Sequence, residues 1–179
     1  MDEREAIELI STAVAGSGVT WADIGAGSGT FTRALRSLLP AGSRIYAVDQ
    51  DPSAVSQLRG IGEGVIAVRA DFTRPVVLPD QVALDGLLLA NALHFVRHPD
   101  EVLRQLARLV RPGGRVVIVE YDRRAANPWV PYPVQSDRWP ALAKSAGLTT
   151  PRITARTPSR YTGELYVGVA SVPGSGPPA

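Results

Sequence analysis

The segment from Asp23 to Thr30 carries the strongest fold signal in this chain. It reads Asp-Ile-Gly-Ala-Gly-Ser-Gly-Thr and lies between a short apolar run, residues 19–22, and a helix-like stretch, residues 31–39. A strand, a glycine turn and a helix in this order make backbone N–H groups and a helix N-terminus face a ligand. Glycine also lets a ligand approach the main chain without a Cβ in the way. The segment therefore predicts a ligand-binding turn in an α/β fold.

The spacing of the glycines distinguishes between two kinds of ligand. The NAD fingerprint is G-x-G-x-x-G, which seats a pyrophosphate on the helix N-terminus. Here the pattern is G-x-G-x-G, position 30 is Thr, and Asp23 stands two residues before the first glycine. A carboxylate at that place would repel a pyrophosphate but could organise a site for a cationic amine. An NAD-dependent oxidoreductase is therefore the less favoured interpretation.

Polar residues also follow three later strand-like runs. Asp49, Asp71 and Asn91 each stand at the end of an apolar segment, and Asp49 comes 22 residues after Gly27. Ligands of open α/β sheets bind outside the carboxyl ends of the strands. These residues are therefore expected to meet at one ligand site.

Taken together, these segments resemble the class I S-adenosylmethionine-dependent methyltransferases. Residues 23–30 resemble motif I of that family, and the order of elements is similar to the family's from Val19 to about Ala170, including Pro112-Gly113-Gly114 before a strand. The resemblance implies a single Rossmann-like α/β domain with a mostly parallel seven-stranded sheet. A C-terminal antiparallel hairpin strand and helices on both faces complete this fold.

The implied cofactor is S-adenosyl-L-methionine, which carries an ammonium group, a sulfonium and no phosphate. In this interpretation Asp49 accepts both ribose hydroxyls, Asp71 binds the adenine amino group, and Phe72 lies against the ring. The predicted cofactor-binding residues are Asp23, Gly25, Ala26, Gly27, Asp49, Gln50, Asp71, Phe72 and Asn91.

The secondary-structure pattern alternates between strands and helices, as βαβ units require. Pro75 and Pro79 argue against a helix between residues 71 and 84, where the family often has one. Pro112-Gly113-Gly114 is expected to end a helix and start a strand, and residues 151–157 and 164–171 are expected to form a hairpin. Helices are predicted at residues 3–14, 30–39, 52–59, 99–110 and 136–146.

Composition limits the chemistry and the number of domains. The 179 residues predict one domain, residues 1–171, and a disordered tail rich in Pro, Gly and Ser, residues 172–179. Because the chain has no cysteine, disulfides, thiolate metal sites and a cysteine nucleophile are excluded. With only two histidines, no metal centre is predicted.

The remaining bulk features concern location and source. No apolar run reaches the roughly 18 residues of a membrane span, and the charged residues 1–5 do not resemble a signal peptide, so a cytoplasmic protein without a membrane partner is expected. Lys144 is the only lysine among 19 basic residues, which is typical of a GC-rich bacterial genome. A homodimer stays open.

His94 is the predicted catalytic residue. It follows Asn91 by three positions, where relatives that act on small molecules often place a polar or aromatic residue. An imidazole titrates near neutral pH and can take a proton from the acceptor. A histidine that only packs in the core explains the sequence equally well.

The segment 121–133 is expected to overhang the site, because it leaves the carboxyl end of the fifth strand. Long irregular segments in compact domains tend to be functional. Tyr121, Trp129 and Tyr132 are therefore predicted to line an apolar acceptor pocket, with ordinary packing as the alternative. Arg160 is predicted to stand on the same rim.

The favoured function is methyl transfer to an O or N atom of a small molecule. We hypothesise that the acceptor carries an acidic group, bound by Arg160 or Arg156, although surface arginines are often only solvated charge. The fourth strand lacks the Asn/Asp-Pro-Pro-aromatic motif that grips adenine or glutamine, and a nucleic-acid partner is not favoured. A noncatalytic cofactor-binding subunit or sensor of the same fold is the alternative.

Overall fold

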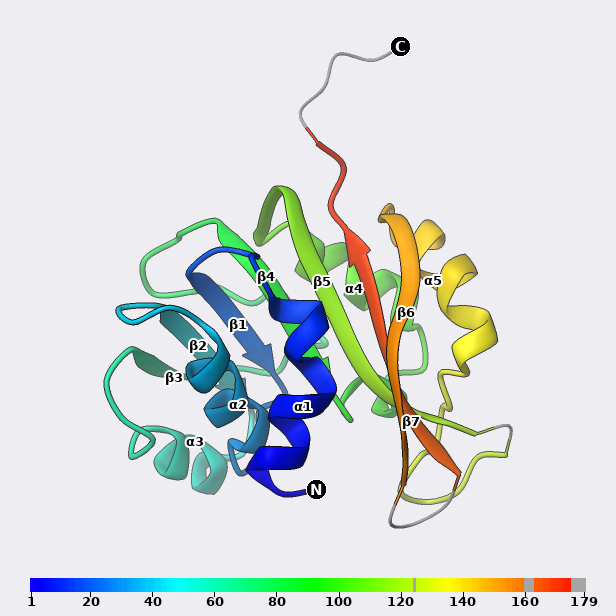
Figure 1. Ribbon diagram of the computed structural model, residues 1–179, viewed down its shortest axis with the longest axis horizontal. Coiled ribbons are helices and arrows are strands. Elements are labelled where there is room, and N and C mark those ends of the chain that lie inside the picture. Colours follow the sequence, from blue (N-terminus) through cyan, green and yellow to red (C-terminus); the bar gives the residue numbers. More distant parts are fainter. Residues whose placement is uncertain (124, 160–162, 175–179) are drawn as a thin grey trace.

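The computed structural model describes residues 1–123, 125–159 and 163–174. Its centre is a seven-stranded sheet with the strand order β3-β2-β1-β4-β5-β7-β6 (Figure 1). The strands are β1 (Thr20–Ile24), β2 (Arg44–Asp49), β3 (Val65–Arg69), β4 (Leu84–Ala90), β5 (Val110–Asp122), β6 (Thr149–Pro158) and β7 (Glu164–Ser171). The predicted fold class is confirmed.

The direction of the strands decides which loops share an edge. Strands β1 to β5 pair in parallel, and β7 is antiparallel to both β5 and β6. Strand β6 therefore runs in the same direction as the parallel strands. Its carboxyl end, Pro158, lies on the same side of the molecule as the turn that follows β1.

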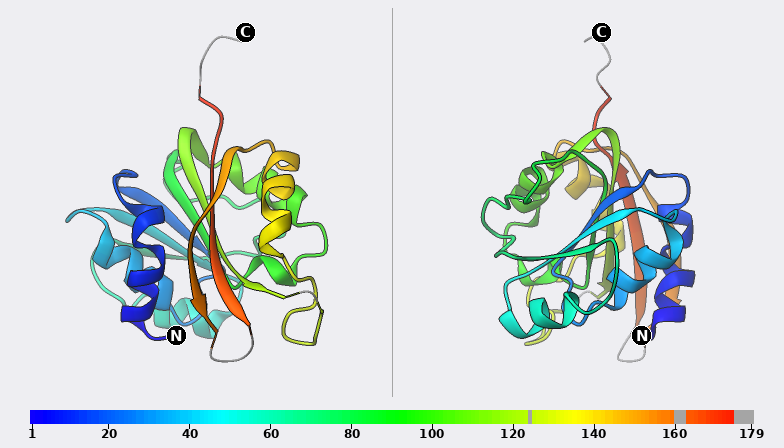
Figure 2. Two further views of the ribbon diagram at one scale, coloured as in Figure 1. Left: turned by 45° about the vertical axis from the view of Figure 1, so that its right-hand side comes forward. Right: turned by 90° about the vertical axis from the view of Figure 1, so that its left-hand side faces the viewer.

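Helices cover both faces of the sheet (Figure 2). Leu88 packs with α1 and α2 on one face, whereas its neighbours Leu87 and Leu89 pack with α4 and α5 on the other, as the alternation of a strand requires. Between β3 and β4 the chain forms turns and no helix, as its prolines predict. The helices are α1 (Glu3–Val14), α2 (Thr30–Leu38), α3 (Pro52–Leu58), α4 (Pro99–Ala107) and α5 (Trp139–Ser145), with 3-10 turns η1 (Leu93–Phe95) and η2 (Ser136–Arg138).

The segment Pro112-Gly113-Gly114 differs from its prediction. Helix α4 ends at Ala107, and Val110 already pairs with Leu84, so the Pro-Gly-Gly segment forms an irregularity inside β5 and does not separate a helix from a strand. A Cβ on Gly114 would lie 2.9 Å from the Asp85 carbonyl oxygen. The glycine therefore serves a close approach of two backbones, which the sequence pattern could not distinguish from a helix stop.

The C-terminal part follows the predicted hairpin. The segment predicted as a helix at 136–146 begins with the 3-10 turn η2 and continues as α5. Within the predicted tail, Val172 exchanges backbone hydrogen bonds with Gly113 and Gly114, and residues 175–179 lie outside the described residues. None of the helices in the described ranges is both long and apolar enough to cross a membrane.

Candidate cofactor and acceptor site

The turn after β1 is held by the neighbouring strand. The backbone N–H groups of Gly25 and Ala26 donate to the Val48 carbonyl oxygen at 2.8 and 3.0 Å. Gly25 has φ +73°, and a Cβ there would come within 2.8 Å of the Ala92 Cβ. Gly27 has φ +52°, and the space where its Cβ would stand is open. The turn thus presents bare backbone to an open space, as a bound ligand would need.

Asp49 ends β2 beside this turn. Its Oδ2 accepts the Gly27 N–H at 2.8 Å, and its Oδ1 accepts the Asp51 N–H at 2.9 Å. Each carboxylate oxygen has a further lone pair for a ligand hydroxyl. Asp51 in turn caps α3 through the Ser53 N–H, and Pro52 stands at the first helical position.

Asp23 lies beneath the turn and is only 1% exposed. Burial raises the pKa of its carboxyl to about 7; the Thr32 hydroxyl, which donates to Oδ2 at 2.6 Å, opposes this rise, and the negative charge of Asp49 adds to it. Asp23 does not line the cavity described below. A cation bound at the turn would favour its ionised form.

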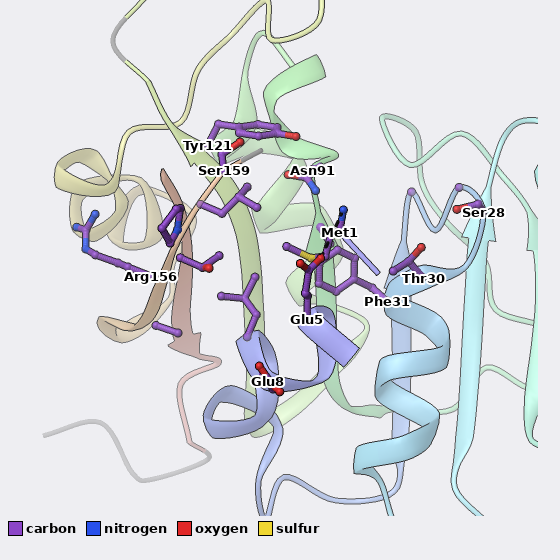
Figure 3. Close-up of a pocket in the computed structure, with 18 of the residues that line it drawn as sticks. Met1, Glu5, Glu8, Ser28, Thr30, Phe31, Asn91, Tyr121, Arg156 and Ser159 are labelled. Carbon is purple, nitrogen blue, oxygen red and sulfur yellow. Dashed lines mark ion pairs between the residues drawn. The ribbon is translucent and has the colours of Figure 1, made fainter. Parts of the chain in front are cut away.

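A cavity of about 610 Å³ opens between the turn, helix α1 and the carboxyl ends of β4, β5 and β6 (Figure 3). The predicted residues Gly25, Ala26, Gly27, Asn91 and Tyr121 line it. Across from the strands, α1 contributes two carboxylates and an apolar side chain. These are Glu5, Glu8 and Leu9.

The backbone conformation and the side-chain oxygen of Asn91 both fit a ligand-binding residue. Its backbone is left-handed, with φ +53°, and its N–H donates to the Val119 carbonyl oxygen at 2.8 Å. Its Oδ1 is buried and has no hydrogen-bond partner among the described residues. Because a buried acceptor without a donor costs free energy, a ligand N–H at this place would be stabilising.

The predicted adenine-side residues Gln50, Asp71 and Phe72 do not line the cavity, but Phe72 lies next to the turn. The Asp71 Oδ1 accepts the Thr73 hydroxyl at 2.7 Å and the Thr73 N–H at 3.0 Å, and these bonds lower the pKa of Asp71. The Phe72 ring lies 3.5 Å from the place where a Gly25 Cβ would stand. Gln50 is exposed. These positions stay predicted cofactor contacts.

His94 forms a buried pair with Glu120. The His94 Nδ1 lies 2.6 Å from the Glu120 Oε2, and the side chains are 3% and 0% exposed. The Glu120 Oε1 accepts the backbone N–H groups of Leu93 and His94 at 2.8 and 3.2 Å. One carboxylate therefore holds both the η1 turn and one nitrogen of the imidazole. The centroids of the His94 and Tyr121 rings are 5.9 Å apart, and of these two residues only Tyr121 lines the cavity.

The predicted acceptor residues are not all in one place. Tyr121 lines the cavity, but Trp129 is 77% exposed, and Tyr132 lines a separate cavity of about 610 Å³ beside α5. The Tyr132 N–H donates to the His94 carbonyl oxygen at 3.0 Å, which ties this segment to η1. Arg160 lies outside the described residues.

Sequence reasoning missed three charged residues of this region. Glu120 stands inside an otherwise apolar run, Val116 to Val119, and an acid at a buried strand position is the signal that could have identified it. Glu5 and Glu8 lie in the helix predicted at residues 3–14, and only the packing of α1 beside the turn places them at the cavity.

A family model described as a methyltransferase domain matches residues 22–118. This match covers the glycine turn, Asp49, Asn91 and most of β5. The chain belongs to the class I S-adenosylmethionine-dependent methyltransferase family.

Relatives and solved structures agree with this assignment. A ubiquinone/menaquinone biosynthesis C-methyltransferase of Pseudomonas aeruginosa is 29% identical over 111 residues, 59% of this chain and 43% of that protein. An uncharacterised methyltransferase of Mycobacterium tuberculosis is 32% identical over 108 residues, 60% of this chain and 42% of that protein. The chain thus spans less than half the length of these curated relatives.

Among solved structures, the 1,6-didemethyltoxoflavin-N1-methyltransferase of Burkholderia thailandensis is similar with a TM-score of 0.74 and 25% identity. The similarity covers 96% of this chain and 78% of that one, whose structure holds 1,6-didemethyltoxoflavin and S-adenosylhomocysteine. A methyltransferase from Aquifex aeolicus has a TM-score of 0.68 and shares the fold at 16% identity.

Proposed function

We propose that the protein transfers the methyl group of S-adenosylmethionine to a small molecule, and that His94 removes a proton from this acceptor. The observation that carries the proposal is the buried His94–Glu120 pair at the ends of β4 and β5, next to the cavity wall formed by Tyr121.

The residues around the turn fit the cofactor. When bound, S-adenosylmethionine supplies an electrophilic methyl group on its sulfonium. The Asp49 carboxylate would accept the ribose hydroxyls, the bare backbone at Gly27 would admit the ligand, and the unpartnered Asn91 Oδ1 would accept an N–H of its ammonium group. Asp23, beneath the turn, favours a cationic ligand through its charge.

Glu120 determines which ring nitrogen of His94 can act as the base. A carboxylate at Nδ1 favours the tautomer with the proton on that nitrogen, which leaves Nε2 as the acceptor. The Glu120 carboxylate also fixes the orientation of the imidazole while Nε2 takes the proton, as in other carboxylate–histidine pairs. Such a base contributes about 10²–10⁴-fold to the rate. The alignment of acceptor and methyl group supplies the larger part, roughly 7–11 kcal/mol.

A base points to an acceptor whose nucleophile is weak until it loses a proton. Phenols, enols and carbon atoms activated by a carbonyl or hydroxyl group belong to this class, and so do weakly acidic ring N–H groups. The names of the Pseudomonas C-methyltransferase and the Burkholderia N1-methyltransferase are consistent with this breadth. We therefore add an activated carbon to the O and N acceptors that the sequence favours.

The test uses the full chain, S-adenosylmethionine with a labelled methyl group, and 1,4-dihydroxynaphthalene as the first probe in a panel of phenols and 1,3-dicarbonyls. His94→Gln should lower the transfer rate about 10²–10⁴-fold and leave the affinity for S-adenosylhomocysteine within about twofold. His98→Gln is the matched control, because His98 is exposed and makes no side-chain cap.

Equal rates in wild type and His94→Gln would remove His94 as the base. Binding of S-adenosylhomocysteine without transfer to any member of the panel would favour the noncatalytic subunit or sensor. NMR of the product would identify the methylated atom.

A further inference from the structure

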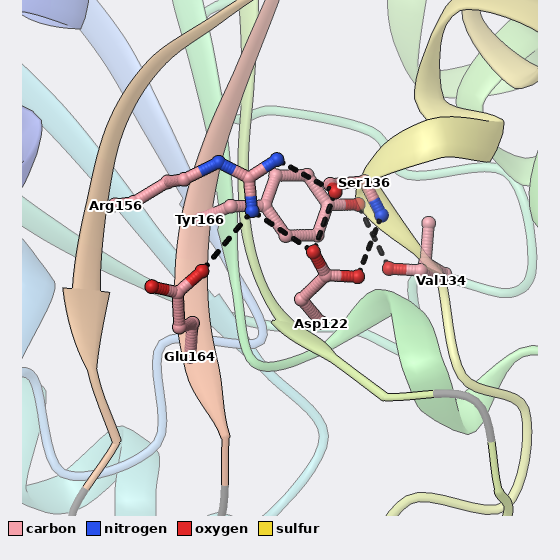
Figure 4. A network of polar contacts seen from close by, with 6 residues as sticks. All are labelled: Asp122, Val134, Ser136, Arg156, Glu164 and Tyr166. Atoms are coloured by element: carbon pink, nitrogen blue, oxygen red, sulfur yellow. Dashed lines mark hydrogen bonds and ion pairs between the residues drawn. The ribbon is translucent and has the colours of Figure 1, made fainter.

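Arg156 lies at the centre of a network that joins three strands and the segment before α5 (Figure 4). Its Nη1 donates to the Asp122 Oδ2 at 2.9 Å and to the Glu164 Oε2 at 3.3 Å, and its Nη2 donates to the Ser136 hydroxyl at 2.8 Å. These partners come from the end of β5, the start of β7 and η2.

The guanidinium is directed away from the cavity. Arg156 belongs to the cavity lining, but its charged end turns toward Asp122 and Ser136 (Figures 3 and 4). Two carboxylates surround this one cation, and the hydrogen bond to Asp122 raises the pKa of Arg156 further. Its charge is therefore compensated inside the protein, which weakens the hypothesis that Arg156 binds an acidic group of the acceptor.

The same contacts join the two ends of the segment between Asp122 and Ser136. The chain leaves the network at Asp122 and returns to it at Ser136, whose hydroxyl and N–H donate to the two Asp122 carboxylate oxygens at 2.6 and 3.2 Å. Burial alone would raise the pKa of Asp122, but the bonds from Ser136 and Arg156 outweigh it and lower that pKa. Next to the network, the Tyr166 hydroxyl donates to the Val134 carbonyl oxygen at 2.8 Å.

We infer that Asp122, Ser136 and Arg156 form a rim clamp that positions the acceptor wall, that is, Tyr121 and residues 125–135. The clamp fixes Tyr121, the neighbour of Asp122, and the segment 125–135, which reaches back to the η1 turn through Tyr132. It controls how well an acceptor binds without contacting the acceptor's charge. Glu164 is less important to the clamp, because among the described residues of the network its side chain bonds only Arg156. The inference rests on the proposed function in that it concerns the acceptor side of the same cavity.

The first arm of the test needs no acceptor. Hydrogen exchange is followed in peptides covering residues 125–136, with S-adenosylhomocysteine bound, in Asp122→Asn, Arg156→Gln, Arg156→Lys and Glu164→Gln. Exchange should accelerate about tenfold or more in Asp122→Asn and Arg156→Gln, less in Arg156→Lys, and little in Glu164→Gln. The affinity for S-adenosylhomocysteine should stay within about twofold in all four. Unchanged exchange in Arg156→Gln would overturn the clamp.

The second arm compares 1,4-dihydroxynaphthalene with 1,4-dihydroxy-2-naphthoic acid, which adds a carboxylate to the same ring. The clamp predicts that Asp122→Asn and Arg156→Gln both raise KM about tenfold for either probe, with kcat changed less than about threefold. If Arg156 instead binds an acidic acceptor, Asp122→Asn would free the guanidinium and lower KM for the acid, and Arg156→Gln would raise KM for the acid alone. That pattern overturns the clamp. If neither probe is methylated, the same KM comparison is made with a member of the panel that is; if no member is methylated, the proposed acceptor class fails, while the exchange arm still decides on the clamp.

Discussion

The cofactor side and the acceptor side of the site are built in different ways. At the ends of β1 and β2 the turn is held through its backbone, by the Gly27 N–H that donates to Asp49 and by the Gly25 and Ala26 N–H groups that donate to Val48. At the ends of β4 to β7 the site depends on pairs of charged or titratable side chains, as in His94–Glu120 and Asp122–Arg156. A ligand-binding turn therefore depends on backbone shape, whereas the acceptor side depends on side-chain pairs that only the fold brings together.

The largest effect is expected on the acceptor side, from Glu120→Ala. This change leaves the His94 imidazole and two backbone N–H groups buried without their acceptor. Each unsatisfied donor costs about 1–3 kcal/mol, so the melting temperature and the transfer rate should both fall. Glu120→Gln keeps the shape and an oxygen for the backbone, so it should lower transfer with a smaller loss of stability. Full transfer by Glu120→Gln would contradict the role given to the carboxylate.

On the cofactor side, Gly25→Ala and Gly27→Ala form a matched pair. Both residues have positive φ, which costs a non-glycine residue roughly 1–2 kcal/mol. Only at Gly25 would the new Cβ also approach Ala92, to 2.8 Å, so Gly25→Ala should lower the melting temperature more. At Gly27 the new methyl group enters the open space, and it should lower S-adenosylhomocysteine affinity more than stability. Equal melting temperatures of the two variants would show that the turn accommodates a Cβ at Gly25 without a further loss of stability.

A smaller, pH-dependent effect is expected from Asp23. Its pKa of about 7 in the fold exceeds the ordinary value, so between about pH 4 and 7 the folded state binds more protons than the unfolded state. The stability contributed by this group therefore falls as the pH rises through that range. A cationic ligand at the turn favours the carboxylate, so its affinity should rise up to about pH 7 and then level off.

Calorimetry at pH 6 in two buffers of different ionisation enthalpy measures this linkage. Wild type should release on the order of one proton per S-adenosylhomocysteine bound, and Asp23→Asn should release much less. Equal proton release in both proteins would assign the pH dependence to another group.

The smallest effect on stability is expected from Trp129→Ala. Because this side chain is 77% exposed, the free energy of unfolding should change by no more than about 0.5 kcal/mol. KM for 1,4-dihydroxynaphthalene then measures whether Trp129 contacts an acceptor, as the sequence predicts. An unchanged KM would leave Trp129 as a surface residue and restrict the acceptor wall to Tyr121.

The same contrast explains how much the sequence could predict. The strand–turn–helix signal at residues 23–30, the Asp51 cap and the prolines between β3 and β4 act locally, so their structures follow from short segments. The Glu120 partner of His94 and the Asp122 partner of Arg156 depend on the register of β5 with β4, β7 and β6, which no short segment encodes. Arg156 therefore looked like a free cation, and Trp129 and Tyr132 looked like one pocket, until the fold placed them apart.

The affinity for S-adenosylhomocysteine tests most directly whether cofactor binding depends on the turn and not on the acceptor side. It is measured by calorimetric titration of wild type, Asp49→Ala and His94→Gln. Loss of a charge-assisted hydrogen bond costs about 1.5–3 kcal/mol, so Asp49→Ala should weaken binding at least about tenfold, and His94→Gln should stay within about twofold of wild type. Unchanged affinity in Asp49→Ala, or an equal loss in His94→Gln, would contradict a cofactor held at the turn and a base that serves the acceptor alone.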